Sequence, residues 1–383
     1  MRFEFATATR ILFGPGAVQE LPNIARQFGA RALLVAGLNQ ERVRPILSAL
    51  ESAGVETSNL IVDGEPTLAV VREGVHLARD GCDFILGFGG GSAIDTAKAV
   101  AALTTNSGEP LDYLEVIGKG HALENPPIPF IAIPTTAGTG AEVTRNAVLG
   151  SPEHGIKASL RSPLMLAKVA IVDPDLTLNL PPRLTASTGL DALTQLIEPY
   201  VSNRANPMAD VFCREGMERV SSCLVSVFSD RENRAARESM SFASLLGGLA
   251  LANAGLGVIH GFAGVLGGML GAPHGSLCAA LLPHGIAINV RALRKRTPEH
   301  VALQKYSEVA RILIGDSEAE AENTTVWVSA LCDQLRVSPL RNHCLAHAQI
   351  PELVEKTEKA SSTKANPIAL TREELTEIAE RAL

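Results

Sequence analysis

The first half of the chain alternates short apolar runs with segments of helical periodicity. Apolar runs lie at 31–37 (RALLVAG), 59–64 (NLIVDG) and 83–88 (DFILGF), separated by helical patterns at 40–54 and 68–81. Further strands are predicted within 128–142 (IPFIAIPTTAGTGAE) and 168–176 (KVAIVDPDL). Strands alternating with helices of this length form βαβ units, so we predict an α/β domain with a mostly parallel sheet.

The strand pattern stops near residues 180–182, where long helical runs take over. ALTQLIEPYV, ADVFCREGMERVSSCLVSVF and LQKYSEVARILIG all carry helical spacing of apolar positions. We therefore predict an α/β domain over 1–181 and an all-α domain over 182–383. The last helix is predicted to begin at a capping box, with Thr371 as N-cap and Glu374 three residues later.

Residues 83–98, DFILGFGGGSAIDTAK, join a predicted strand to a predicted helix through three consecutive glycines. Gly89, Gly90 and Gly91 lack Cβ atoms, so the backbone adopts positive φ easily and approaches a ligand closely. Ser92 stands where an N-cap is expected. Free amides and the helix dipole at such a terminus favour a phosphate group. The alternative is a strand-to-helix turn without a ligand, because neither a G-x-G-x-x-G nor a Walker pattern is present.

Composition narrows the classes of protein. The net charge of −7, without a basic cluster, argues against a nucleic-acid partner. The six cysteines form no C-x-x-C pair, which indicates reduced thiols in the cytoplasm, and the first residues show no signal-peptide pattern. Residues 239–290 contain no Asp, Glu, Lys or Arg, but their histidines and glycines favour a buried helical core over a membrane span.

Several motifs in matching order resemble the iron-containing (group III) alcohol dehydrogenase family. They are FGPGA (13–17), GGGSAIDTAK (89–98), IPTTAGTGAEVT (133–144), VDPDLTLNLPP (172–182), STGLDALTQLIEPY (187–200) and VIHGFAG…APHG (258–275). The resemblance implies the dehydroquinate synthase-like architecture, with an α/β nucleotide-binding domain and an all-helical metal-binding domain. It also implies an NAD(P)-dependent alcohol dehydrogenase or aldehyde reductase, a homodimer acting on a small alcohol or aldehyde. A divalent metal, Fe²⁺ or Zn²⁺, would assist hydride transfer in the interdomain cleft.

The resemblance also assigns the cofactor site. Gly89, Gly90, Gly91 and Ser92 would hold the pyrophosphate, supported by Asp95 and Lys98 on the following helix. The phosphates, ribose or nicotinamide would contact Thr135, Thr136, Thr139 and Lys157. From the residues alone, each threonine suits turn capping equally well.

Gly37 bears on the choice between NAD and NADP. It ends the predicted strand RALLVAG (31–37). At this position many relatives carry an aspartate that binds the adenosine ribose and repels a 2′-phosphate. Asn39, Gln40 and Arg42 follow as candidate partners of that phosphate. The sequence slightly favours NADP; alternatively, Gly37 only ends a strand and NAD binds without the carboxylate.

The metal site departs from the family pattern. The resemblance implies an aspartate and three histidines as ligands, at positions 191, 195, 260 and 274; Asp191, His260 and His274 match, but residue 195 is Gln. Asp191 and His260 would also be the catalytic residues. Three interpretations stay open: zinc held by three residues and a water, Gln195 as a weak fourth ligand through its amide oxygen, or loss of the metal. Gly264 is a second departure, because many relatives place a proton-relaying histidine there.

The remaining histidines are predicted to lie outside the ligand set. His284 is interpreted as structural or as a donor to a ligand, and His343 and His347 as an i, i+4 pair on a helix face. The alternative functions are a maleylacetate reductase-like enzyme and a metal-free nucleotide-binding relative. A lyase of the dehydroquinate synthase type is disfavoured by IPTTAGTGAEVT.

Overall fold

The computed structural model describes residues 2–383 and divides the chain into two compact units. The α/β unit comprises Ala6–Thr136 and Gly140–Leu178. The helical unit comprises Asn179–Leu383, together with Ala137–Thr139 and the described residues up to Phe5. The chain therefore passes into the helical unit a few residues before the predicted boundary.

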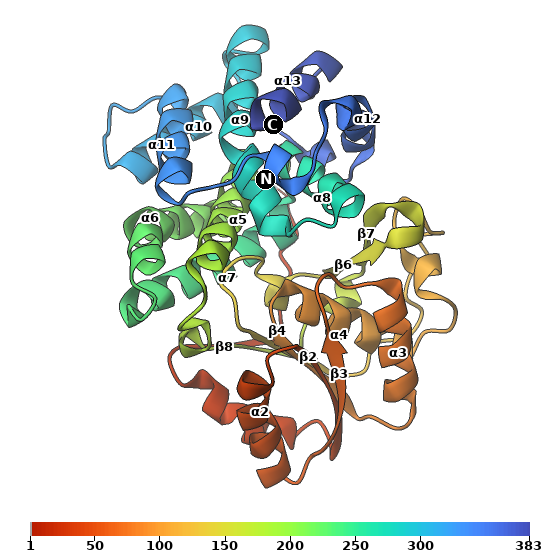
Figure 1. Ribbon diagram of the computed structural model, residues 1–383. Coiled ribbons are helices and arrows are strands. Elements are labelled where there is room, and N and C mark those ends of the chain that lie inside the picture. The colour runs from red at the N-terminus through yellow and green to blue at the C-terminus, as the bar shows by residue number, and fades with distance from the viewer. Residues whose placement is uncertain (1) are drawn as a thin grey trace. The chain divides into compact units, whose positions relative to one another are not determined.

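The α/β unit is built on a parallel sheet (Figure 1), which confirms the predicted fold class. Its order is β1-β8-β5-β4-β2-β3, and every neighbouring pair runs parallel. The strands are β1 (Arg10–Phe13), β2 (Arg31–Gly37), β3 (Glu56–Val62), β4 (Phe84–Gly89), β5 (Phe130–Pro134) and β8 (Val169–Val172). Every residue of β4 is buried, as expected of a central parallel strand covered on both faces.

Helices cover both faces of this sheet. Those of the α/β unit are α1 (Leu21–Ala25), α2 (Gln40–Ser52), α3 (Leu68–Arg79) and α4 (Gly91–Thr104). Leu34 and Leu86 share one apolar cluster with residues of α1 and α2. On the opposite face, a Cβ placed on Gly87 would lie 2.9 Å from the Ala97 Cβ, so α4 packs directly against β4. Alternate residues of one strand thus face different helices.

A hairpin absent from the sequence prediction lies beside α4. It consists of β6 (Asn146–Ser151) and β7 (Ile156–Arg161), paired antiparallel. The Asp95 Oδ2 atom accepts a hydrogen bond from the Val148 amide at 3.0 Å, and the Lys98 Nζ donates to the Asn146 carbonyl at 2.6 Å. Polar side chains of α4 therefore position this hairpin.

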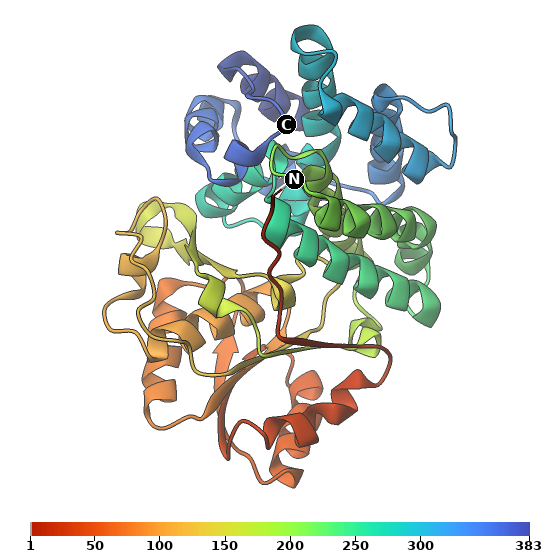
Figure 2. The same cartoon turned by 180° about the vertical axis from the view of Figure 1, so that it is seen from behind.

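Across 179–383 the regular elements are helical, as predicted (Figure 2). Thr371 caps the last helix and forms the predicted capping box with Glu374. The helices are α5 (Pro182–Val201), α6 (Pro207–Ser229), α7 (Arg234–Ala254), α8 (Val258–Leu270), α9 (His274–Arg296), α10 (Val301–Ile314), α11 (Ala321–Gln334), α12 (Ile350–Lys359) and α13 (Arg372–Ala382).

The uncharged stretch 239–290 falls on α7, α8 and α9. Among the described residues, α9 is long and apolar enough to cross a membrane, and so is the pair α7 and α8 if its bend of 99° is ignored. The apolar window of α9 is 78% buried inside the protein. Its apolar side chains are therefore covered by protein, as in the core helix of a folded unit.

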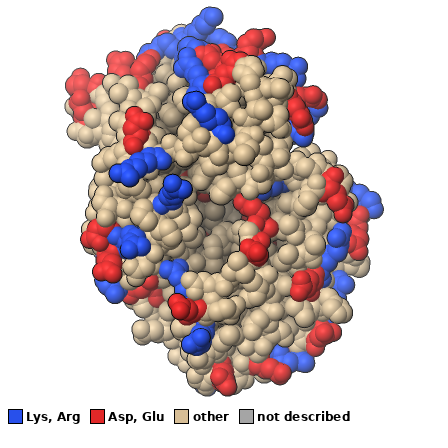
Figure 3. All heavy atoms as spheres, viewed as in Figure 1, with Lys and Arg blue, Asp and Glu red and all other residues tan. Residues whose placement is uncertain are grey.

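Many charged side chains pair with a side chain of opposite sign. On the face in Figure 3, basic and acidic side chains are interspersed. Arg291 pairs with Glu377 and Arg296 with Glu374, which links α9 to α13. Exposed pairs of this kind contribute at most about 1 kcal/mol each, so burial of apolar surface provides most of the stability.

We expect Lys98→Met to destabilise the α/β unit by about 3 kcal/mol, because the Asp95 carboxylate loses its cation in a buried setting. The side chains of Lys98 and Asp95 are only 1% and 13% exposed. Urea unfolding would measure the loss. The double variant Lys98→Met/Asp95→Leu should recover part of it, and equal stabilities of the parent and Lys98→Met would contradict the ion-pair argument.

Candidate active site

The glycine turn at the carboxyl end of β4 leaves the first amides of α4 without a side-chain cap. Gly89 has a φ of +154°, and a Cβ there would lie 2.8 Å from the Ala93 Cβ, so only glycine fits without strain. The N-cap is Gly90, not Ser92 as predicted, and it has no side chain to bond the amides. Ser92 is instead the second residue of α4. A bound anion could therefore accept from these amides.

Thr135 and Thr136 lie beside this turn. The Thr135 amide donates to the Gly89 carbonyl at 2.9 Å. The Thr136 side chain would lie 3.5 Å from a Cβ placed on Gly90. Thr139 belongs to the segment Ala137–Thr139, which groups with the helical unit.

The charged residues predicted to support the cofactor make internal contacts. The Lys98 Nζ is 3.3 Å from the Asp95 carboxylate and donates to the Thr144 Oγ1 at 2.9 Å, besides its bond to β6. Burial lowers the pKa of Lys98 and raises that of Asp95. The Lys157 Nζ lies 3.0 Å from a Glu65 carboxylate oxygen, and its side chain is 5% exposed. A cofactor contact of these residues stays a prediction.

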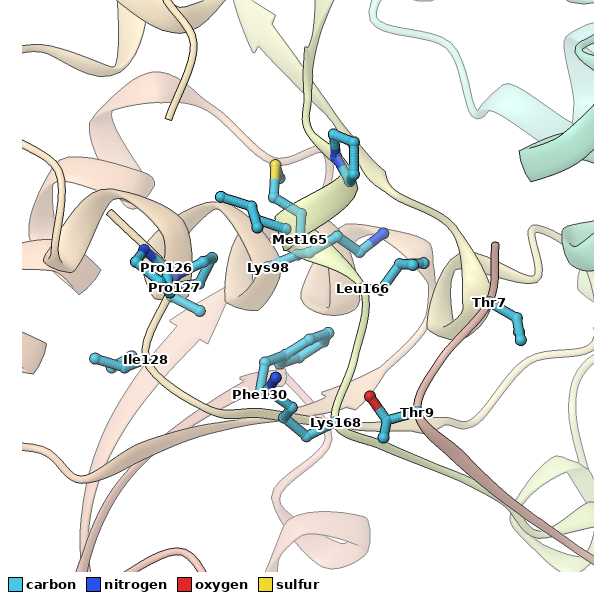
Figure 4. Close-up of a pocket in the computed structure, with 13 residues that line it drawn as sticks. Thr7, Thr9, Lys98, Pro126, Pro127, Ile128, Phe130, Met165, Leu166 and Lys168 are labelled. Carbon is cyan, nitrogen blue, oxygen red and sulfur yellow. The ribbon is translucent and has the colours of Figure 1, made fainter. Parts of the chain in front are cut away.

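A cavity of about 210 Å³ in the α/β unit lies apart from the turn. Lys98 and Ala101 of α4, Phe130 of β5 and Lys168 contribute to its wall (Figure 4). Neither the glycines 89–91 nor Thr135 line it. Lys98 is thus the one predicted cofactor residue that lines this cavity, and the others lie outside its wall.

At the end of β2, Gly37 has room for a side chain, because no heavy atom lies within 4 Å of a Cβ placed there. Asn39 caps α2 by accepting from the Arg42 amide at 3.3 Å. The Arg42 guanidinium donates to the Leu176 and Leu178 carbonyls at 3.2 and 2.8 Å. Gln40 is exposed. Arg42 is thus engaged with the backbone, which weakens its candidacy as a phosphate partner.

In the helical unit, four ligating side chains converge. The ligand atoms of Asp191, His260, His274 and Cys278 all lie within 4.8 Å of one another. The structure thus brings three of the predicted ligands together and adds Cys278, which the sequence interpretation missed. The available signal was its spacing, because Cys278 follows His274 by four residues, one turn along a helix.

Glu198 holds α8 and His260 in place. Its Oε1 atom accepts from the Ile259 amide at 2.7 Å, and its Oε2 atom lies 2.7 Å from the His260 Nδ1. A carboxylate only accepts, so the His260 Nδ1 carries the proton and its Nε2 is the ligating atom. A Cβ on Gly257 would lie 2.8 Å from the Glu198 Oε1, which explains the glycine at the N-cap of α8.

A close approach of α9 to α5 brings His274 to Asp191. A Cβ on Gly275 would lie 2.7 Å from the Ser187 carbonyl oxygen and 3.5 Å from the Asp191 Cβ. Glycine at this position lets the first turn of α9 reach α5. The side chain of Asp191 is 2% exposed and that of His274 is 32% exposed, so the site is buried on one side and accessible on the other.

The donor separations fit a metal ion. The Asp191 Oδ1 lies 3.4 Å from the His260 Nε2 and 3.7 Å from the His274 Nε2, and the Cys278 Sγ lies 3.6 Å from the latter. Zinc–ligand bonds of about 2.0–2.3 Å place the donors of a tetrahedron roughly 3.3–3.6 Å apart. Among residues 2–383, the buried Asp191 Oδ1 has no hydrogen-bond partner. A buried carboxylate oxygen that accepts no hydrogen bond is costly, and a cation at this position would satisfy it.

Electrostatics also favour an anionic Asp191. Burial alone raises its pKa, but the His274 and His260 imidazoles outweigh this effect and lower the pKa below its ordinary value. The pKa of His260 is raised, because Cys278, Asp191 and Glu198 together overcome the opposite effect of burial. Burial raises the pKa of the Cys278 thiol to about 12. A metal must therefore displace protons from this cluster when it binds.

Gln195 lies one turn from Asp191 on α5 and is 2% exposed. Its Nε2 donates to the Gly138 carbonyl at 2.9 Å. That contact identifies the other amide atom as oxygen, and this Oε1 is buried without a hydrogen-bond partner among the described residues. Ligation through the amide oxygen stays a prediction.

The remaining histidines lie elsewhere. Half-buried His284 is on α9, where burial lowers its pKa. The prediction that His343 and His347 share a helix face was wrong, because they occupy separate 3₁₀ helices, Leu340–His343 and His347–Gln349. The His347 Nε2 instead lies 3.4 Å from a Glu380 carboxylate oxygen.

Comparison with known proteins identifies the family. The family model described as iron-containing alcohol dehydrogenase matches residues 8–174, and the model of the C-terminal part of the same family matches residues 185–383. The chain belongs to the iron-containing alcohol dehydrogenase family. This confirms the resemblance seen in the sequence.

Characterised relatives of this family cover nearly the whole chain. Alcohol dehydrogenase 4 of Schizosaccharomyces pombe is 33% identical over 97% of this chain and 87% of its own length. The 1,3-propanediol dehydrogenase of Klebsiella pneumoniae is 33% identical over 99% of this chain and 98% of its own length. Sulfoacetaldehyde reductase of Bilophila wadsworthia is 31% identical over 99% of both chains. All three are named as oxidoreductases that interconvert alcohols and carbonyl compounds.

Solved structures agree with the fold. A crystal structure of 1,3-propanediol oxidoreductase has a TM-score of 0.91 at 32% identity and covers 100% of both chains. The sulfoacetaldehyde reductase of Bifidobacterium kashiwanohense, solved in complex with NAD⁺, has a TM-score of 0.84 at 29% identity, with 99% of this chain and 98% of that one covered. The family thus uses a nicotinamide dinucleotide and a metal.

We expect the substitution Glu198→Gln to weaken metal binding by this protein about 10–100-fold. A glutamine whose oxygen still accepts from the Ile259 amide turns its NH₂ group toward the His260 Nδ1. The Nδ1 atom must then accept this hydrogen bond, so the ring proton moves to Nε2 and blocks metal ligation there. Titration with Zn²⁺ would measure the affinity. Glu308→Gln is the control, because Glu308 pairs with Arg214 outside the cluster. Unchanged affinity in Glu198→Gln would contradict the tautomer argument.

Proposed function

We propose that the protein is an NAD(P)-dependent alcohol dehydrogenase or aldehyde reductase that requires a divalent metal held by Asp191, His260 and His274. The observation that supports this most is the buried Asp191 Oδ1, which accepts no hydrogen bond from the described residues and faces two imidazoles. The relatives named above as acting on alcohols, propanediol and sulfoacetaldehyde support a small alcohol or aldehyde as substrate.

The metal, when bound, would polarise the substrate carbonyl and stabilise the alkoxide. The chain's own part is to present the ligating atoms in a fixed arrangement. Glu198 keeps the proton on the His260 Nδ1 and thereby keeps Nε2 directed at the Asp191 Oδ1. The partly exposed His274 leaves the site open on the side from which a substrate would enter.

The nicotinamide dinucleotide would accept or deliver the hydride. The uncapped first turn of α4 and Gly89, Gly90 and Gly91 are proposed to hold its pyrophosphate, with Thr135 and Thr136 beside them. Roles for Ser92, Thr139, Lys157, Asp95 and Lys98 in the cofactor site are retained as proposals. For Asp95 and Lys98 we propose indirect support, because both bind the β6 hairpin.

We propose that water, rather than a side chain, exchanges the substrate proton near Gly264. No heavy atom lies within 4 Å of a Cβ placed on Gly264, so the space next to its backbone is open. His260 is less suited to the task because both of its ring nitrogens face carboxylates.

We also propose a cytoplasmic homodimer. All six cysteines are free thiols, which suits a reducing compartment. The dimer follows from the family resemblance and would be measured by sedimentation.

The activity test combines metal analysis with oxidation of NADPH and NADH against a panel of aldehydes, with and without added Zn²⁺ or Fe²⁺. We expect metal-dependent turnover, reduced about 100-fold or more in Asp191→Asn, because the substituted amide carries no charge to hold the ion. His347→Gln, which alters an exposed histidine, serves as the control. Turnover that persists in metal-free protein would contradict the proposal and favour the metal-free alternative.

We propose NADP as the preferred cofactor, since Gly37 lacks the carboxylate that would repel a 2′-phosphate. Gly37→Asp should shift the ratio of kcat/KM for NADPH to that for NADH by about tenfold toward NADH, equivalent to about 1.4 kcal/mol. The Cβ of the new side chain would meet no heavy atom within 4 Å. Gly37→Asn is a neutral control of the same size and should shift the ratio less. Equal shifts in both variants would argue against a charge effect.

A further inference from the structure

We infer that the Cys278 thiolate is the fourth protein ligand of the metal, replacing the imidazole missing at position 195, and that the site is therefore selective for zinc over iron. This inference rests on the proposed function, because it concerns the same metal. It adds a ligand and an ion to that proposal.

The first support is the position of the sulfur atom. The Cys278 Sγ lies 3.6 Å from the His274 Nε2 and within 4.8 Å of the ligating atoms of Asp191 and His260. With bonds of about 2.3 Å to sulfur and 2.0–2.1 Å to nitrogen, a tetrahedral site separates these two donors by roughly 3.6 Å. Because His274 and Cys278 lie one turn apart on α9, a single helix sets their separation.

The second support is the contrast with two other buried thiols of the helical unit. The Cys223 Sγ contacts the Arg219 carbonyl, and the Cys332 Sγ contacts the Ala279 carbonyl at 3.7 Å, as expected of small side chains packed in a helical core. Cys278 instead faces two imidazoles and an aspartate. Its surroundings are those of a ligand.

The third support is the state of Gln195. The Gly138 carbonyl holds its Nε2, so a neutral amide oxygen is the one donor atom that Gln195 could still offer a metal. A neutral oxygen is a weak substitute for an imidazole, whereas a thiolate supplies both a strong bond and a negative charge. Together with the Asp191 carboxylate, the Cys278 thiolate would balance the charge of a divalent cation.

The choice of ion follows from the donors. Thiolate ligands are soft and favour Zn²⁺ in tetrahedral sites, while carboxylate and imidazole donors accept Fe²⁺ as well. Replacing one imidazole by a thiolate therefore shifts the preference of this site toward zinc. Binding releases the thiol proton to solvent.

Cobalt substitution tests the ligand directly. The full-length protein, stripped of metal and loaded with Co²⁺, should show an intense near-ultraviolet absorption band from thiolate-to-cobalt charge transfer. Cys278→Ser should lose this band. Its Zn²⁺ affinity should fall about 100-fold or more, because removal of a residue that only orients a ligand already costs about 10–100-fold in metal affinity. Cys332→Ser, which removes another buried thiol, should retain both.

A second variant tests the compensation between positions. Gln195→His/Cys278→Ser should bind Co²⁺ without the sulfur band and should shift competition between Zn²⁺ and Fe²⁺ toward Fe²⁺. A parent protein whose cobalt spectrum lacks the sulfur band would overturn the inference, and so would Zn²⁺ affinity unchanged in Cys278→Ser. If Cys278→Ser does not fold, the bands of the parent and of Cys332→Ser still decide the question.

The two proposals fail separately. Metal-dependent turnover with a cobalt spectrum that lacks sulfur ligation would overturn only the role of Cys278. A sulfur band in a protein that oxidises neither NADPH nor NADH with any aldehyde would support the ligand and reject the proposed enzyme.

Discussion

The carboxylate of Glu198 is the interaction on which the candidate metal centre depends. It extends from α5, accepts from the first turn of α8 and orients the His260 ring through a second oxygen. It thereby links the helix that carries Asp191 to the helix that carries His260. A buried carboxylate is stable only when its oxygens accept hydrogen bonds, so Glu198 requires its contacts with Ile259 and His260 at once. Moving either partner would leave a charge uncompensated.

Glycines permit the close approaches that this arrangement requires. Gly257 admits the Glu198 oxygen at the start of α8, and Gly275 lets α9 reach α5 beside Asp191. Gly89 has the same effect in the α/β unit, where its left-handed φ turns the chain from β4 into α4. In each case a Cβ would collide with a neighbour. Gly37 and Gly264 differ, because no heavy atom lies within 4 Å of a Cβ placed at either position and packing therefore does not require glycine there.

The buried polar groups around Lys98 and around Asp191 are satisfied to different degrees. The Lys98 ammonium has three internal acceptors, so this network is complete without a ligand. The Asp191 Oδ1 and the Gln195 Oε1 are buried and lack hydrogen-bond partners within residues 2–383. Native structures satisfy nearly all buried polar atoms, so two buried acceptors without hydrogen bonds on residues one turn apart on α5 indicate a missing cation or donor.

The sequence alone determined the architecture and the family, because both follow from local patterns: strand and helix periods, the glycine turn and the spacing of Asp191, His260 and His274. It also determined the capping box at Thr371, whose two partners lie three residues apart. Only the tertiary structure revealed Cys278 as a neighbour of Asp191 and Glu198 as the partner of His260, 62 residues away. It also showed that Gly90 caps α4 and that Arg42 is engaged with backbone carbonyls. Periodicity places residues on the face of one helix, but contacts between helices depend on packing, which no local pattern encodes.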